Sequence, residues 1–245
     1  MQIGAQLWLF HALLDEDSME TILTHLKAAG YACVETMYGK PPQNRSVLDR
    51  LDLKCCATHI ALCAMPAGAE LANFARRMGA ETICISGLLR WQEREADDYR
   101  RSAEALNVWG RRLKSEGLAL AYHNHDFEFA GVEGAATGMD LLLSGLDPEV
   151  VSLCFDAGWA ERAGHDSADF LRQHPAHIRM LHLRDFRSAQ SVPLGAGDLD
   201  LSSVLTTLPS LPNLQAILVE QDPGTTTPAE DMAESRRFLK ERFSL

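Results

Sequence analysis

The sequence alternates between short apolar segments rich in β-branched residues and longer segments whose apolar residues recur every three or four positions. A short segment of the first kind is typical of a buried strand, and the longer spacing is typical of a helix with one buried face. Regular alternation of the two favours a parallel sheet, because parallel strands need crossover connections that are usually helical. The pattern therefore restricts the chain to α/β folds.

Eight strands can be counted along this pattern. We expect them at residues 3–9, 31–37, 53–60, 82–86, 118–122, 150–155, 178–183 and 216–219. The last helix should begin with Thr227 at its N-cap, followed by Pro228 and, two positions later, Glu230. Eight strand–helix units in 245 residues predict a single (β/α)8 TIM barrel, an α/β domain that spans residues 1–245. A doubly wound sheet is the alternative, but no glycine-rich phosphate loop follows the first strand.

Charge and composition narrow the partners and the compartment. The net charge is −11, which argues against nucleic acid as a partner, because phosphate binding normally needs a basic patch. No apolar run reaches the roughly 20 residues that cross a membrane, and no basic segment precedes the first strand pattern. The six cysteines include no C-x-x-C pair, so we expect buried thiols in a reducing compartment. We therefore expect a cytoplasmic protein, and the sequence leaves open whether it forms a homo-oligomer.

Acidic and histidine side chains stand at or just after the C-terminal ends of four expected strands. These residues are Glu128, Asp156, His182 and Glu220. The C-terminal ends of barrel strands meet at one mouth, where barrel enzymes place their active sites. Three carboxylates and one imidazole suit one divalent metal ion, such as Mn²⁺, Mg²⁺, Co²⁺ or Zn²⁺. An Asp directly after a strand is also typical of a helix N-cap. The four residues together therefore predict a metal site more strongly than any one of them does.

Further residues near the same strand ends are candidates for substrate contacts. The segment after the fifth strand is rich in polar side chains, and its two histidines could bind either metal or substrate. An aromatic ring close behind Asp156 would offer a face for a sugar ring, and an arginine two positions after His182 should point to the same side of its strand. The candidates are Glu35, His59, His123, His125, Trp159 and Arg184.

Five segments together resemble the xylose isomerase-like TIM-barrel superfamily, the sugar phosphate isomerase/epimerase group, and the similarity runs over essentially the whole chain. They are residues 122–129, 155–159, 182–185, 194–197 and 219–222. The resemblance implies one divalent cation held by a Glu, an Asp, a His and a second Glu, which map onto Glu128, Asp156, His182 and Glu220. Many relatives carry Glu where this chain has His123, so the ligand from the fifth strand is either Glu128 or His123. Many also have His and Lys at the positions of Trp159 and Arg184.

The resemblance implies a sugar isomerase or epimerase that transfers a proton through a metal-stabilised enediolate. Glu128 and Glu220 are the candidates for the catalytic pair that removes and returns the proton, with Glu35 as an alternative base. A metal-dependent dehydratase or hydratase, a lyase acting on a keto-sugar or keto-inositol, shares this enediolate and is the main alternative. A non-catalytic sugar-binding barrel is a minor alternative. An abasic-site endonuclease of the same superfamily is disfavoured by the net charge of −11.

Overall fold

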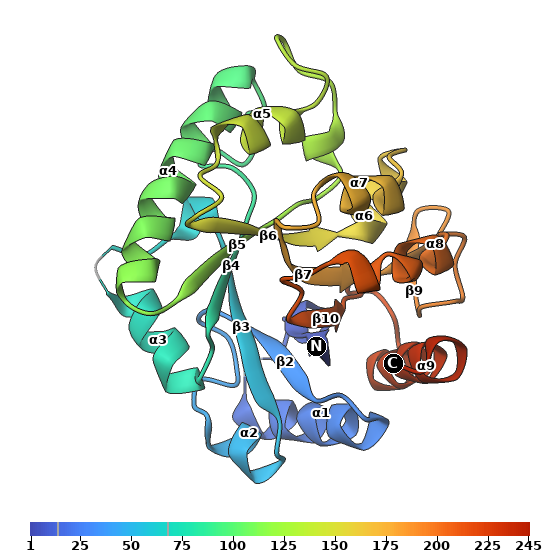
Figure 1. Cartoon of the computed structure of the whole chain (residues 1–245). Helices are drawn as coiled ribbons and strands as arrows, with labels where there is room; N and C mark the ends of the chain where they lie inside the picture. Colours follow the sequence, from blue (N-terminus) through green and yellow to red (C-terminus); the bar gives the residue numbers. More distant parts are fainter. Residues whose placement is uncertain (14, 68) are drawn as a thin grey trace.

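A closed barrel of eight parallel strands forms the centre of the computed structural model, which describes residues 1–13, 15–67 and 69–245 (Figure 1). Around the barrel the strands follow the order β1-β10-β7-β6-β5-β4-β3-β2. Their bounds are β1 (Gln2–Gln6), β2 (Cys33–Met37), β3 (Lys54–Ala61), β4 (Thr82–Ser86), β5 (Ala119–His123), β6 (Val151–Asp156), β7 (Ile178–Leu183) and β10 (Ala216–Val219). The predicted (β/α)8 barrel is confirmed, and the strands expected at 82–86, 178–183 and 216–219 have the predicted bounds.

Helices surround the barrel and bury their apolar faces against it (Figure 1). They are α1 (Glu16–Ala29), α2 (Ser46–Arg50), α3 (Glu70–Met78), α4 (Ala96–Ser115), α5 (Gly138–Gly145), α6 (Ala157–Arg162), α7 (Ser167–Gln173), α8 (Leu201–Thr206) and α9 (Pro228–Phe243). Short 3-10 turns lie at Leu7–Phe10, Leu62–Ala64, Phe127–Phe129 and Leu208–Ser210. Within the described residues, no helix combines the length and the apolar character needed to cross a bilayer.

The last helix begins where the sequence predicted, with Thr227 as N-cap and Pro228 as the first helical residue. The capping bond itself is not formed, because the Thr227 hydroxyl donates to Asp231 at 3.0 Å instead of accepting a backbone N–H. The helices α2 and α6 were not expected. Each is so short that it shows less than one full repeat of a helical apolar pattern.

A short antiparallel hairpin after β7 was also not expected. Its strands are β8 (Asp185–Arg187) and β9 (Gln190–Val192). The Asp185 carboxylate holds the following loop by accepting the backbone N–H groups of Gly195 and Gly197, both at 3.0 Å. A Cβ atom at Gly197 would lie 2.1 Å from Asp185 Oδ1, so the loop can approach the carboxylate only with glycine at this position. This contact accounts for the Gly-Ala-Gly segment in the sequence.

The interior of the barrel is filled mostly with small or sulfur-containing side chains below the mouth. They are Cys33, Ala57, Cys84, Ala121, Cys154, Met180, Ala216 and Leu218. Strand β1 contributes Gly4 here, and a Cβ atom on it would lie 2.5 Å from Cys33 Sγ. The interior is therefore a packed core, as in other barrels of this kind, and chemistry is confined to its ends.

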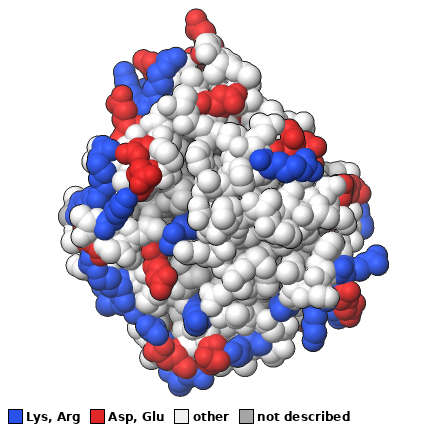
Figure 2. Space-filling view, viewed as in Figure 1, with Lys and Arg blue, Asp and Glu red and all other residues white. Residues whose placement is uncertain are grey.

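The surface carries charges of both signs. Figure 2 shows that acidic and basic side chains alternate along the edge of this face, over α3 and α4 among others, while much of its middle is uncharged. A nucleic-acid surface would need a broad region of positive charge. The face shown lacks such a region among its described residues, in keeping with the net charge of −11.

Candidate active site

A cavity of about 350 Å³ opens at the C-terminal ends of the strands, where the sequence placed the site. It is lined by Gln6, Trp8, Met37, His59, Ala61, Ser86, Trp91, His123, His125, Trp159, Arg184, Glu220 and Asp222. Five of the six predicted substrate contacts line this cavity, and the sixth, Glu35, lies directly behind it, bonded to His59. The prediction of one shared mouth therefore agrees with the positions of these side chains.

Four metal-ligand side chains converge beside this cavity. One ligand-type atom from each of His123, Asp156, His182 and Glu220 lies within 4.8 Å of the other three, and all four residues are buried. His123 ends β5, Asp156 ends β6, and His182 pairs with Asp156 across the neighbouring strand β7. Glu220 directly follows β10. Parallel strands in register thus bring together residues that are far apart in the sequence.

Glu128 does not join this cluster, in contrast to the expectation for the strand-five ligand. Its carboxylate accepts the Tyr122 hydroxyl at 2.6 Å and the backbone N–H of His125 at 2.8 Å. Burial raises the pKa of Glu128 to about 7, although both hydrogen bonds act in the opposite direction. The chain turns back on itself after β5, so that Glu128 closes the turn and His123 occupies the place beside Asp156 and His182.

His182 lies between two carboxylates. Its Nδ1 atom is 2.6 Å from Glu220 Oε2, and its Nε2 atom is 2.7 Å from Glu35 Oε2. Burial disfavours a charged imidazole, but the two carboxylates outweigh it and raise the pKa of His182 well above its usual value. A histidine that binds a metal through one nitrogen normally gives its other N–H to a carboxylate. Glu35 is therefore placed to orient His182 while Nδ1 faces Glu220.

Glu35 also connects His182 to a second histidine. Its other oxygen is 2.5 Å from His59 Nδ1, and His59 Nε2 is 2.9 Å from the Ser86 hydroxyl. Burial would raise the pKa of Glu35, but His182 and His59 hold it at about 2. Burial would lower the pKa of His59, but contacts with Cys84 and Glu35 raise it to about 10. Glu35 is thus a charged bridge between two histidines, and it does not line the cavity, which argues against its role as the base that meets the substrate.

Arg184 binds three carboxylates at once. Its Nε, NH2 and NH1 atoms lie 2.8, 2.7 and 2.8 Å from oxygens of Asp156, Glu220 and Asp222 respectively. Arg184 is only 1% exposed, and a buried guanidinium needs partners of this kind. Asp222 was given no role of its own in the sequence analysis, although it lies in segment 219–222, and Ser86 was not singled out. Their roles become visible only when β4, β7 and β10 close into one barrel.

The segment that follows β6 makes room for this arginine. Gly158 lies so close that a Cβ atom on it would be 2.2 Å from Arg184 Cγ. The guanidinium carbon of Arg184 lies 4.7 Å from the centre of the Trp159 ring, within range of a cation–π contact. Asp156 also caps α6, because its Oδ1 accepts the Trp159 N–H at 2.8 Å. Asp156 therefore both caps α6 and belongs to the cluster of metal-ligand side chains at the mouth.

The charges and donors of the site fit a divalent cation. The buried carboxylates of Glu35, Asp156 and Glu220 carry three negative charges and buried Arg184 carries one positive charge, which leaves a deficit of two. Protons on His59 and His182 would supply that charge, and a divalent ion bound at His182 would take the place of its proton. His123 Nδ1 is buried without a hydrogen-bond partner in the described part of the chain, as expected for an unused ligand atom. Two imidazoles and two carboxylates suit Zn²⁺, Mn²⁺ or Co²⁺.

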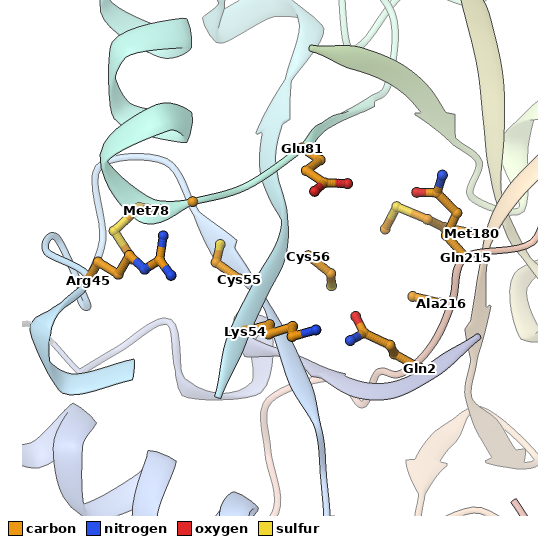
Figure 3. Close-up of a pocket in the computed structure, with 11 residues that line it drawn as sticks. Gln2, Arg45, Lys54, Cys55, Cys56, Met78, Glu81, Met180, Gln215 and Ala216 are labelled. Atoms are coloured by element: carbon orange, nitrogen blue, oxygen red, sulfur yellow. The ribbon is translucent and has the colours of Figure 1, made fainter. Parts of the chain in front are cut away.

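A second cavity, of about 470 Å³, lies at the opposite end of the barrel (Figure 3). It is bounded by the first residues of several strands, including Gln2, Lys54 and Ala216. No histidine is found among its described lining residues, and Glu81 is the one carboxylate among them. Barrels use this end for stability rather than for catalysis. The mouth therefore remains the candidate active site.

Known proteins agree with this fold. Residues 23–242 match the sequence model of the family described as xylose isomerase-like TIM barrel. The chain belongs to this family. Several residues that carried the resemblance in the sequence, among them Asp156, His182 and Glu220, lie together at the mouth.

Proteins similar to this chain in sequence or in fold have several names. Inosose dehydratase from Clostridium perfringens is 28% identical to this chain over 171 residues. The match covers 61% of this chain and 56% of the relative, so it spans little more than half of that protein's length. A sugar phosphate isomerase/epimerase from Parabacteroides distasonis shares the fold with a TM-score of 0.83 at 19% identity, covering 99% of this chain and 94% of that one. The IolI protein, solved with a zinc atom, has a TM-score of 0.73 at 15% identity, with 100% of both chains covered.

Proposed function

We propose that this protein is a metal-dependent enzyme that removes a proton next to the carbonyl group of a small carbohydrate, and that it then eliminates water. The observation that carries the proposal is the distribution of acids and histidines around the mouth. The carboxylates that line the cavity, Glu220 and Asp222, both follow β10. Directly across the barrel lies β4 with Ser86, next to His59 on β3. One side thus offers a base and the other an acid.

This arrangement favours a dehydratase over the isomerase or epimerase expected from the sequence. Proton transfer by a carboxylate on each face would have used Glu128 with Glu220, but Glu128 is buried under the turn after β5. A dehydratase needs one base for the C–H proton and one acid for the departing hydroxyl group. With a pKa of about 10, His59 keeps its proton at neutral pH and fits the acid.

The proposed steps balance as an elimination. A divalent cation held by His123, Asp156, His182 and Glu220 would polarise the substrate carbonyl and acidify the adjacent C–H bond. A Glu220 oxygen accepts that proton, and the electron pair of the C–H bond forms a carbon–carbon double bond. The neighbouring C–O bond breaks, and the hydroxyl group takes a proton from His59 Nε2, through the Ser86 hydroxyl, and leaves as water. The products are an unsaturated ketone and one water molecule.

The lining of the cavity supports a neutral sugar or cyclic polyol as substrate. Trp8, Trp91 and Trp159 line the cavity and offer aromatic faces to a sugar ring. Arg184 is the one Arg or Lys side chain among the described lining residues, and each of its nitrogens is bonded to a carboxylate. A phosphate group would therefore find no free guanidinium or ammonium group there. The name of the relative, inosose dehydratase, supports a cyclic keto-polyol.

Isomerisation or epimerisation is the second candidate, supported by the position of His59 across the barrel from Glu220. Glu220 would take the proton on one face of the enediolate, and His59 would give a different proton, its own, on the other face. Both reactions begin with the same proton abstraction, so they differ in whether the hydroxyl group leaves. A single assay can therefore separate them.

The test uses the full chain loaded with Mn²⁺, with a keto-inositol and a 3-keto-hexose as substrates in D₂O. A dehydratase gives an unsaturated ketone, seen by ultraviolet absorbance and by the mass of the lost water. An isomerase or epimerase gives deuterium at carbon without loss of water. Glu220→Gln should remove either signal, and Glu133→Gln, the same change at an exposed position, should keep it. If neither water loss nor deuterium uptake occurs with any such substrate, the proposed function is wrong.

A further inference from the structure

Two cysteine side chains lie directly below the histidines of the mouth. Cys84 on β4 and Cys154 on β6 both point into the barrel and are fully buried. The two Sγ atoms and one ring nitrogen from each of His123 and His182 all lie within 4.8 Å of one another. These strands alternate around the barrel, β4 and β6 for the thiols and β5 and β7 for the imidazoles. Alternate strands supply successive layers of a barrel interior.

His123 and His182 therefore take part in two groups of metal-ligand atoms. The upper group adds the carboxylates of Asp156 and Glu220, and the lower group adds the thiols; Cys154 lies two residues before Asp156 on β6, on the side away from the mouth. The upper group offers nitrogen and oxygen, and the lower group offers nitrogen and sulfur. Hard ions prefer oxygen ligands and soft ions prefer thiolates. The chemistry of the ion would decide which group holds it.

We propose that Cys84, His123, Cys154 and His182 form a second metal site, a buried S₂N₂ site for a thiophilic ion such as Cd²⁺. Two thiolates and two imidazoles are a typical ligand set for tetrahedral zinc. Tetrahedral bonds of about 2.0 Å to nitrogen and 2.3 Å to sulfur place ligand atoms about 3.3 to 3.8 Å apart. Atoms that already lie within 4.8 Å of one another reach that geometry by moving inward by about 1 Å.

The local contacts permit this movement. His123 Nδ1 has no hydrogen-bond partner in the described part of the chain, so a metal bond to it breaks nothing. His182 must exchange one of its two carboxylate contacts for the metal. Each thiol gives up its proton to solvent when the ion binds. Because both groups need His123 and His182, an ion in the lower site excludes one from the upper site.

A different set of thiols provides an internal control. Cys55 and Cys56 line the cavity at the other end of the barrel, as Figure 3 shows, where the described lining contains no histidine. Cys63 is exposed. A soft ion that merely sought sulfur would bind at these positions, whereas the proposed site requires sulfur and imidazole together.

The test adds ¹¹³Cd²⁺ to the metal-free full chain. We expect thiolate-to-cadmium absorption in the ultraviolet that saturates at one ion per chain, and a ¹¹³Cd chemical shift typical of two sulfur and two nitrogen ligands. Cys84→Ser and Cys154→Ser should each remove the absorption, while Cys56→Ser and Cys63→Ser keep it. Circular dichroism checks that the variants are folded, and the ¹¹³Cd shift of the unmodified chain requires no variant.

The result is independent of the proposed reaction. Asp156→Asn removes a ligand of the upper group and should keep the cadmium absorption, although it should lose catalytic activity. A ¹¹³Cd shift typical of oxygen and nitrogen ligands would refute the lower site. Absorption that persists in Cys84→Ser and disappears in Cys56→Ser would likewise refute it and move the ion to the other end of the barrel.

Discussion

The substitution Glu128→Gln tests the largest difference between the sequence prediction and the structure. Glu128 is fully buried, and burial raises its pKa from the ordinary 4.5 to about 7. The pKa difference corresponds to about 3 kcal/mol, because each pKa unit is worth about 1.4 kcal/mol. Between these pH values the folded protein holds a proton that the unfolded chain has lost. The free energy of unfolding therefore falls as the pH rises from 4.5 through 7.

The neutral amide in Glu128→Gln cannot ionise, so the variant lacks this pH dependence. We expect Glu128 to make the free energy of unfolding of the wild-type protein about 2.5 kcal/mol larger at pH 5 than at pH 8. In the variant, this contribution of Glu128 to the pH dependence should be absent. Urea unfolding at pH 5 and pH 8 measures the difference for each protein. Glu133→Gln, the same change at an exposed residue, controls for the loss of a surface charge and should keep the wild-type difference.

Metal binding gives the second readout of the same variant. Because the Glu128 carboxylate contacts Tyr122 and the His125 backbone, Glu128→Gln should keep one Mn²⁺ per chain and should keep its activity. The contrary result is a variant that loses Mn²⁺ and activity while the pH dependence of its stability matches that of the wild type. That result would restore Glu128 as the strand-five ligand in place of His123.

Four further predictions concern the mouth. Glu220→Gln should reduce turnover at least about 100-fold and leave the circular dichroism spectrum unchanged. His59→Gln should lower kcat about 100-fold or more while Mn²⁺ titration still gives one ion per chain. Arg184→Lys should weaken Mn²⁺ binding about 10- to 100-fold, because a single ammonium nitrogen cannot reach the three carboxylates that the three guanidinium nitrogens bind. Arg162→Lys, at an exposed residue stacked on two aromatic rings, should not weaken it. Calorimetry in buffers of different ionisation enthalpy should show proton release when Mn²⁺ binds, since the ion replaces the proton that His182 shares with Glu220.

The fold could be predicted from the sequence because its signal is repeated. Eight apolar segments with helical segments between them predict the barrel even where the bounds of a single strand are wrong by two or three residues. Strand β1, for example, ends at Gln6 rather than at Leu9. The positions of Asp156, His182 and Glu220 follow from the same count, because each stands at or near the end of a strand. The strand period then determines which side chains face inward.

The turn after β5 could not be predicted in the same way. Glu128 is five residues beyond the end of its strand, so the period of the strand no longer determines where its side chain points. Its direction depends on two hydrogen bonds, from the Tyr122 hydroxyl and the His125 backbone, that exist only once the turn is closed. His123 is the last residue of β5 and faces inward with the regular alternation. Position within the strand, rather than residue type, therefore indicates which of the two side chains lies beside Asp156 and His182.

The buried charged groups of the mouth form two networks that meet at His182. Glu35 binds two histidines, and Arg184 binds three carboxylates, so every ionised group of the mouth has a partner of opposite charge. The imidazole of His182 lies where these two networks meet, between Glu35 and Glu220. Without a metal, the positive charge at this point comes from a proton on His182; with a divalent ion, it comes from the ion. The site can therefore gain or lose the ion while each buried carboxylate keeps a partner of positive charge. A buried carboxylate without such a partner would cost several kcal/mol of stability.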